Sequence, residues 1–112
     1  MDTSYKRAEI KKFLNNTLRD YGKEEVTKLI RDGELHNQIF NTDYYLVYTG
    51  ECEDWLGDKV FDVIRTITEY EKDNFGEVTT DLSDPCKLVN MYVYIVGEEL
   101  IGEIMDKTIF RD

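Results

Sequence analysis

The sequence predicts an all-α fold, a compact bundle of about five helices around a central C-terminal helix, Pro85 to Met105. This stretch is the longest apolar run, and it is apolar nearly all round, which is typical of a helix with neighbours on several sides. Asp84 suits its N-cap and Pro85 its first position, where the missing N–H costs nothing. Elsewhere, apolar residues recur at three- and four-residue spacing, the helical period. We therefore expect residues 1–112 to form a single helical domain.

The N-terminal part is expected to hold three helices. Over residues 4–21, an apolar stripe that includes Ile10 and Leu14 predicts the first helix, with Thr3 or Ser4 as its cap. Gly22 is expected to end it in a left-handed conformation. Residues 23–32 and 34–40 predict two short helices separated by Gly33. The second short helix carries no positive charge for phosphates, so DNA reading is not expected.

Residues 41–57 carry two conflicting signals. The run DYYLVYTG has strong strand propensity, yet Tyr44, Tyr48, Cys52 and Trp55 fall on one helical face. A strand needs a partner, and only residues 77–80 offer one. We therefore predict a helix over residues 42–56, which Gly50 weakens by about 1 kcal/mol relative to alanine.

The next helix is predicted over residues 58–75, with Asp58 as its cap and Gly76 after its end. A polar loop then leads to the C-terminal helix. The predicted apolar face of this helix consists of Val60, Phe61, Val63, Ile64, Ile67 and Tyr70.

Composition limits the class of protein. The chain has 112 residues and is 41% hydrophobic, enough for one core rather than a disordered tail. Its longest uncharged apolar run, residues 88–97, is far short of the roughly 20 residues needed to cross a bilayer. The N-terminus has no apolar segment of a secretory signal. Cys52 and Cys86 do not make a disulfide scaffold. We expect a cytoplasmic protein with no membrane partner.

Charge is the strongest compositional feature. Fourteen basic against 24 acidic residues leave a net charge of −10, which disfavours direct binding to nucleic acid or anionic membranes. Residues 1–31 hold eight basic and five acidic residues, whereas residues 32–112 hold six and 19. From Asp32 to Asp58 there are seven acids and no Lys or Arg. The basic first helix is expected to complement the acidic remainder, and the acids indicate either a solvated face or a surface for a basic partner.

No residue pattern predicts catalysis, a cofactor or a metal site. His36 is the one histidine and lacks a second histidine at zinc-binding spacing. Cys52 and Cys86 are expected to be small buried hydrophobic residues. Glu99 and Glu103 share a helical face, where with Glu98 they are expected to mark the point at which the C-terminal helix meets water. The protein is therefore not expected to be an enzyme.

The predicted partner-binding site is an acidic cluster with aromatic neighbours. Acids spaced along a surface can imitate a phosphate backbone, and an exposed aromatic ring can anchor the contact. In the alternative interpretation, Trp55 belongs to the core and the acids are merely solvated. The predicted site residues are Tyr48, Glu51, Glu53, Asp54, Trp55, Asp58 and Asp62.

The tract NFGEVTTDLSDPCKLVNMYVYIVGEEL, with HNQIFNTDYYLVYTG before it, resembles a group of small acidic proteins of bacteriophages and other mobile elements. The group has no defined catalytic motif, so the resemblance assigns no site residue. It implies inhibition of host defence by occupying nucleic-acid sites of nucleases, as anti-CRISPR and anti-restriction proteins do. The basic first helix departs from the pattern of nucleic-acid mimics.

These expectations combine into one hypothesis. The protein is a phage-encoded, anti-CRISPR-like inhibitor that binds a basic, nucleic-acid-binding protein, such as a CRISPR or restriction nuclease, as a nucleic-acid mimic. The alternatives are a structural or assembly protein, for example a homodimer using its tyrosines, and a small enzyme without a recognisable motif.

Overall fold

The computed structural model describes residues 2–40 and 51–109, with the side chains of residues 105–109 left out. Over these ranges the regular structure is helical and contains no strand, which confirms the all-α prediction. No helix within them is long and apolar enough to cross a membrane. The elements are α1 (Arg7–Tyr21), α2 (Lys23–Asp32), α3 (Leu35–Phe40), α5 (Cys52–Leu56), the 3-10 turn η1 (Gly57–Lys59), α6 (Val60–Phe75) and α7 (Pro85–Ile109).

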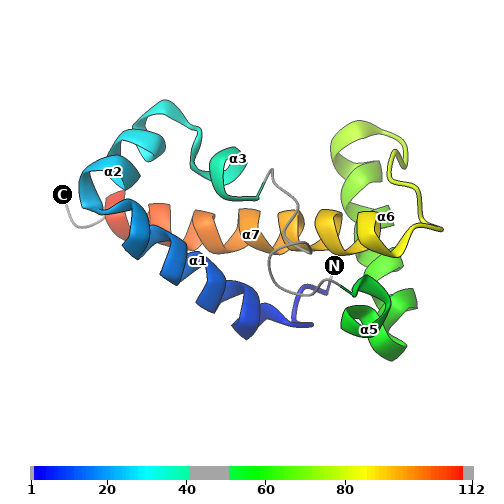
Figure 1. Cartoon of the computed structure of the whole chain (residues 1–112). Coiled ribbons are helices and arrows are strands. Elements are labelled where there is room, and N and C mark those ends of the chain that lie inside the picture. Colours follow the sequence, from blue (N-terminus) through cyan, green and yellow to red (C-terminus); the bar gives the residue numbers. More distant parts are fainter. Residues whose placement is uncertain (1, 41–50, 110–112) are drawn as a thin grey trace.

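Helix α7 is the centre of the bundle, as the sequence predicts. Helices α1, α3, α5 and α6 each pack against it, with α1 and α2 toward one end of the molecule and α5 and α6 toward the other (Figure 1). Because α7 has neighbours on several sides, its buried residues cover most of its circumference. They are Leu88, Val89, Tyr92, Val93, Ile95, Val96, Leu100 and Ile101.

The start of α7 agrees with the prediction, whereas its end lies beyond the predicted one. Asp84 caps its start, because Asp84 Oδ1 accepts the backbone N–H groups of Cys86 at 3.0 Å and of Lys87 at 3.4 Å. The helix continues to Ile109, about one turn beyond the predicted end at Met105. No glycine or proline between Met105 and Ile109 interrupts it.

The start of α1 differs from the prediction. The helix begins at Arg7, preceded by Lys6 at φ 57°, and neither Thr3 nor Ser4 caps it. The hydroxyl group of Thr3 donates instead to Glu99 at 2.8 Å, and the Ser4 hydroxyl group donates to Asp2. Both hydroxyl groups that could cap the helix therefore donate to other acceptors.

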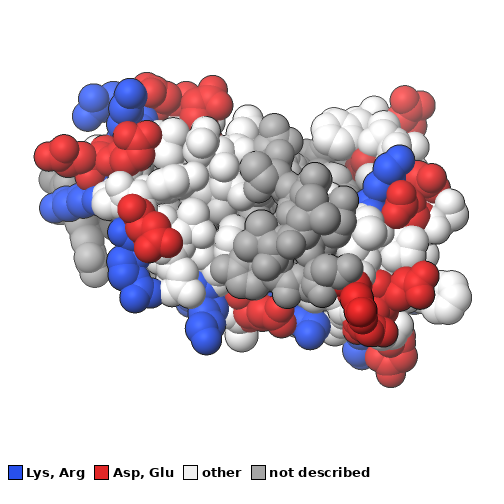
Figure 2. Space-filling model, viewed as in Figure 1, with Lys and Arg blue, Asp and Glu red and all other residues white. Residues whose placement is uncertain are grey.

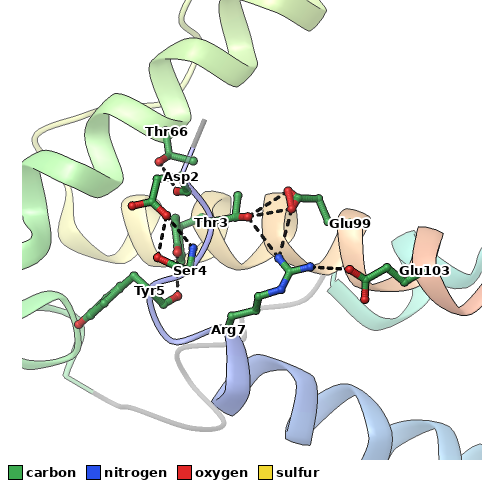
Figure 3. A network of polar contacts seen from close by, with 9 residues as sticks. Asp2, Thr3, Ser4, Tyr5, Arg7, Thr66, Glu99 and Glu103 are labelled. Carbon is green, nitrogen blue, oxygen red and sulfur yellow. Dashed lines mark hydrogen bonds and ion pairs between the residues drawn. The ribbon is translucent and has the colours of Figure 1, made fainter.

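Residues 2–7 form a strap that connects α1 to the helices around it (Figure 3). The Thr66 hydroxyl group on α6 donates to the Asp2 carbonyl oxygen at 2.7 Å, and the Tyr92 hydroxyl group on α7 donates to the Tyr5 carbonyl oxygen at 2.7 Å.

The guanidinium group of Arg7 completes the strap by joining two acids of α7. It lies 3.2 Å from Glu99 and 2.9 Å from Glu103. For Arg7, the expectation that basic groups of the first helix complement acids elsewhere in the chain is correct. Glu99 and Glu103 also lie on one face of α7, as predicted.

Helices α2 and α3 follow the prediction, and Gly33 separates them in the left-handed conformation at φ 71° and ψ 20°. Gly22 also has a positive φ, 83°, but its ψ of 161° is extended. The left-handed helical conformation predicted for Gly22 is therefore wrong, because the same residue must also start α2.

Two predictions for the middle of the chain are wrong, namely the unbroken helix through Glu51 and the cap of α6 at Asp58. Glu51 is extended, at φ −131° and ψ 94°, so a helix does not run unbroken from residue 42 to residue 56, and residues 41–50 lie outside the described part. Asp58 does not cap α6, because it lies within η1 and makes no capping hydrogen bond. Gly76 ends α6 in the left-handed conformation, as predicted.

Gly97 is a point at which α7 packs tightly against Phe40 of α3. A Cβ atom added there would lie 2.6 Å from the Cδ2 and Cε2 atoms of the buried Phe40 ring. We expect Gly97→Ala to lower the free energy of unfolding by about 1–3 kcal/mol, because overpacking outweighs the gain in helix propensity. Urea unfolding measures the change.

Gly102 provides the matched control, since it lies in the same helix and an added Cβ meets nothing within 4 Å. Gly102→Ala should raise the free energy of unfolding by up to about 1 kcal/mol. Equal stability of the two variants would contradict the tight packing of Phe40 on Gly97.

Glu71 is a buried acid that holds the loop after α6. Its side chain is 1% exposed and accepts hydrogen bonds from the Thr79 hydroxyl group and, at 3.0 Å, from the Thr80 backbone N–H. Burial by itself raises the pKa of Glu71, but the hydrogen bonds from Thr79 and Thr80 outweigh it and hold the pKa below its usual 4.5. Glu71 is therefore ionised at neutral pH.

This lowered pKa makes stability depend on pH. A carboxylate with a depressed pKa stabilises the fold above the unfolded-state pKa, and this contribution is lost as the pH falls through the folded-state value. We expect Glu71→Gln to lower the free energy of unfolding at pH 7 by about 1–3 kcal/mol. We also expect it to flatten the loss of stability below pH 4.5. Urea unfolding from pH 7 to pH 3 tests this, with the exposed Glu77→Gln as control, and identical profiles would contradict it.

Candidate functional site

Helix α5 turns its acids outward because its apolar residues face the core. Cys52, Trp55 and Leu56 are 4%, 5% and 1% exposed, and their three- and four-residue spacing gives α5 one buried side. The remaining side presents acids to solvent. Together with the first turn of α6, it forms a surface that we call the acidic face, made of Glu51, Glu53, Asp54, Asp58 and Asp62, all of them exposed.

Trp55, one of the two aromatic anchors predicted for this face, is not exposed on it. Trp55 is buried, with its ring 5.4 Å from the Tyr5 ring in an edge-on arrangement and 6.1 Å from the Tyr92 ring. The Tyr5 hydroxyl group donates to the carbonyl oxygen of Trp55. The prediction that Trp55 binds a partner at the surface is therefore wrong, because the ring packs in the core. Tyr48 lies outside the described residues.

Gly57 allows the chain to turn from α5 into α6. Its φ of 53° and ψ of −131° belong to a region that residues with a side chain rarely adopt. After this turn, Asp58 lies in η1 and Asp62 lies in the first turn of α6. Both follow the acids of α5 closely in the sequence. A substitution of Gly57 would therefore strain the connection that holds the acidic face together.

Phe61 provides an exposed aromatic ring between Asp58 and Asp62. Its side chain is 80% exposed, so the prediction that Phe61 belongs to the apolar face of its helix is wrong. The spacing of residues in the sequence does indicate that this ring is exposed. Phe61 comes two residues before the buried Val63, which places it ~200° round the helix from that residue.

The acidic face keeps most of its charge. Asp62 lies 4.0 Å from Lys59 and 3.9 Å from Arg65, and both pairs are solvent-exposed contacts of small energetic value. Five acids and these two basic residues leave a formal charge of −3. Figure 2 shows acidic side chains gathered at the α5–α6 end of the molecule, with some basic side chains among them.

Two carboxyl groups of the face interact directly. A hydrogen bond with Asp54, and then the like charge of Asp54, raise the pKa of Glu51 above its usual value. Glu51 therefore takes up its proton at a higher pH than an isolated glutamate does.

The other residues with chemical potential have structural surroundings. His36 Nε2 lies 2.9 Å from the Tyr94 carbonyl oxygen, and its ring lies against the Tyr94 ring at a tilt of 38°. Cys52 is buried and Cys86 half-buried, and both line a hollow of about 330 Å³ beside the acidic face. Among the described residues, no group of three or more His, Cys, Asp or Glu side chains is arranged to hold a metal ion.

Comparison of the chain with protein-family models, with curated proteins and with solved structures finds no match.

Proposed function

We propose that this protein acts by binding rather than by catalysis, and that the acidic face docks on a basic, nucleic-acid-binding surface of a partner protein. One observation carries the proposal. Five acids and the exposed Phe61 lie on the short segment formed by α5, η1 and the first turn of α6. Acids of one sign attract a basic surface, and an exposed aromatic ring gives such a contact an apolar anchor.

The two parts of the face have different roles. The carboxylates steer the encounter, so they raise the association rate and make it sensitive to salt. Phe61 becomes buried on docking, so it slows dissociation. Because Trp55 holds α5 against Tyr5 and Tyr92, the carboxylates are presented on a packed scaffold. Pre-ordering of this kind reduces the entropy that binding must offset.

The biological role that fits this surface is inhibition. A row of carboxylates that occupies a basic groove excludes the nucleic acid that the groove normally binds. Together with the resemblance to small acidic proteins of mobile elements, this exclusion supports a role as an anti-CRISPR-like or anti-restriction-like inhibitor of a host defence protein.

Affinity capture from a bacterial lysate at stepped salt tests the proposal. The immobilised protein should retain a nucleic-acid-binding protein at low salt and release it above about 0.3 M, where the Debye length falls below ~6 Å. Phe61→Ala should retain less of it at every step. Retention of the same proteins by wild type and Phe61→Ala at all salt concentrations would contradict docking through this face.

A further inference from the structure

A second candidate site lies at the other end of α6, apart from the acidic face. It is a pocket of about 600 Å³ between α3, the end of α6, the loop after it, and α7. On α7 its lining residues Lys87, Asn90, Met91 and Tyr94 follow the helical spacing of one side. The volume lies in the range of small-ligand sites. None of its lining residues belongs to the acidic face.

Aromatic rings form much of the pocket wall. Phe40 is buried, whereas Phe75 is 55% exposed and meets Tyr70 edge-on, with ring centres 6.2 Å apart. The Tyr94 ring is held against His36, with ring centres 3.9 Å apart and an angle of 38° between the ring planes. With Phe61, Phe75 is one of the two large hydrophobic residues that stand exposed in the described part of the chain. A partly exposed ring in a pocket wall offers a π face to a ligand.

The charges in the wall favour a cation. Glu71 and Asp81 both line the pocket, and Lys87 is the one basic residue among its described lining residues. Asp81 Oδ1 accepts the backbone N–H of Ser83 at 3.0 Å and its hydroxyl group at 2.6 Å, and these bonds lower the pKa of Asp81. Two ionised acids against one lysine leave a formal charge of −1, within a chain of net charge −10.

We propose that this pocket binds the guanidinium group of an arginine side chain. A guanidinium is a planar cation that stacks on aromatic rings and pairs with carboxylates, so it matches the rings of Phe75 and Tyr94 and the carboxylate of Asp81. An anion would meet Lys87 but would be repelled by Glu71 and Asp81. The inference does not rest on the proposed function, because it uses none of the residues of the acidic face.

Titration with N-acetyl-arginine amide, followed by NMR of the Thr80 backbone amide and the Asn37 and Asn90 side-chain amides, tests the inference. N-acetyl-citrulline amide is the matched probe, since it keeps the shape and lacks the charge. We expect the arginine probe to shift these signals and the citrulline probe to leave them nearly unchanged. Equal shifts with both probes, or no shift with arginine, would overturn the inference.

Reversing the charge of Lys87 tests whether the pocket binds a cation or an anion. Lys87→Glu should tighten binding of the arginine probe by about two- to fivefold, because it removes a like charge from the exposed rim. Lys11→Glu, an equal charge change on α1, is the control and should have a much smaller effect. Binding of inorganic phosphate that Lys87→Glu abolishes would instead show an anion site and overturn the inference.

Two further variants separate this pocket from the acidic face. Asp81→Asn keeps an acceptor for Ser83 and should weaken binding of the arginine probe, as should Phe75→Ala. The triple variant Glu53→Lys, Asp54→Lys and Asp58→Lys should bind the probe nearly as wild type does. Loss of probe binding in this triple variant alone would place the arginine on the acidic face and overturn the pocket assignment.

Discussion

Replacing Ile95 by aspartate is expected to unfold the protein. Ile95 is 1% exposed on α7, the helix against which α1, α3, α5 and α6 pack. An aspartate there would place an unpaired charge, or a protonated acid without hydrogen-bond partners, in the core. Either form costs several kcal/mol, a large fraction of the roughly 5–15 kcal/mol by which natural proteins are stable.

Circular dichroism and urea unfolding measure this effect. Lys87→Asp is the matched control, because it introduces the same side chain at an exposed position of the same helix and should leave the fold intact. Cooperative unfolding of Ile95→Asp at the urea concentration of wild type would contradict the central role of α7.

Reversing Glu53, Asp54 and Asp58 together to lysine is expected to abolish partner binding. All three side chains are exposed, so the variant should keep wild-type helicity. The change turns the formal charge of the acidic face and its two basic neighbours from −3 to +3. Like charges facing each other cost several kcal/mol, so affinity for a basic partner should fall at least about a hundredfold. Single reversals should each have a small effect, mostly on the association rate.

An equal reversal at the other end of the molecule provides the control. Glu24, Glu25 and Asp32 of α2 are also exposed, and changing them to lysine alters the net charge of the chain by the same amount. Surface plasmon resonance with the captured partner compares the two triple variants. Equal loss of affinity in both would show that net charge, rather than the acidic face, governs binding.

Local signals predict most of the helical frame. The continuous apolar run predicts α7, Asp84 predicts its cap, and Gly33 and Gly76 predict two helix ends. The start of α1 is not predictable in this way, because the hydroxyl group of Thr3 bonds to Glu99, 96 residues away. A side chain that can cap a helix locally can equally bond to a distant helix, and only the packing of α1 on α7 decides between them.

The candidate site can be predicted only in part, because contacts between residues far apart in the sequence again decide the outcome. The run of acids around α5 identifies exposed carboxylates, and the position of Phe61 relative to Val63 indicates an outward ring, but no local pattern shows that Trp55 is buried. Trp55 packs in the core against Tyr5 and Tyr92, which lie far from it in the sequence. The pocket beside α6 has no linear signature, since α3, α6, α7 and a loop each contribute residues to it.

Competition with nucleic acid tests the central claim most directly. The partner captured from lysate is titrated with this protein in the absence and presence of a saturating oligonucleotide that the partner binds. If the acidic face occupies the nucleic-acid groove, the apparent affinity should fall in proportion to the oligonucleotide concentration, and the protein should displace the oligonucleotide. Unchanged affinity at saturating oligonucleotide would contradict the mimic mechanism and place the contact outside the groove.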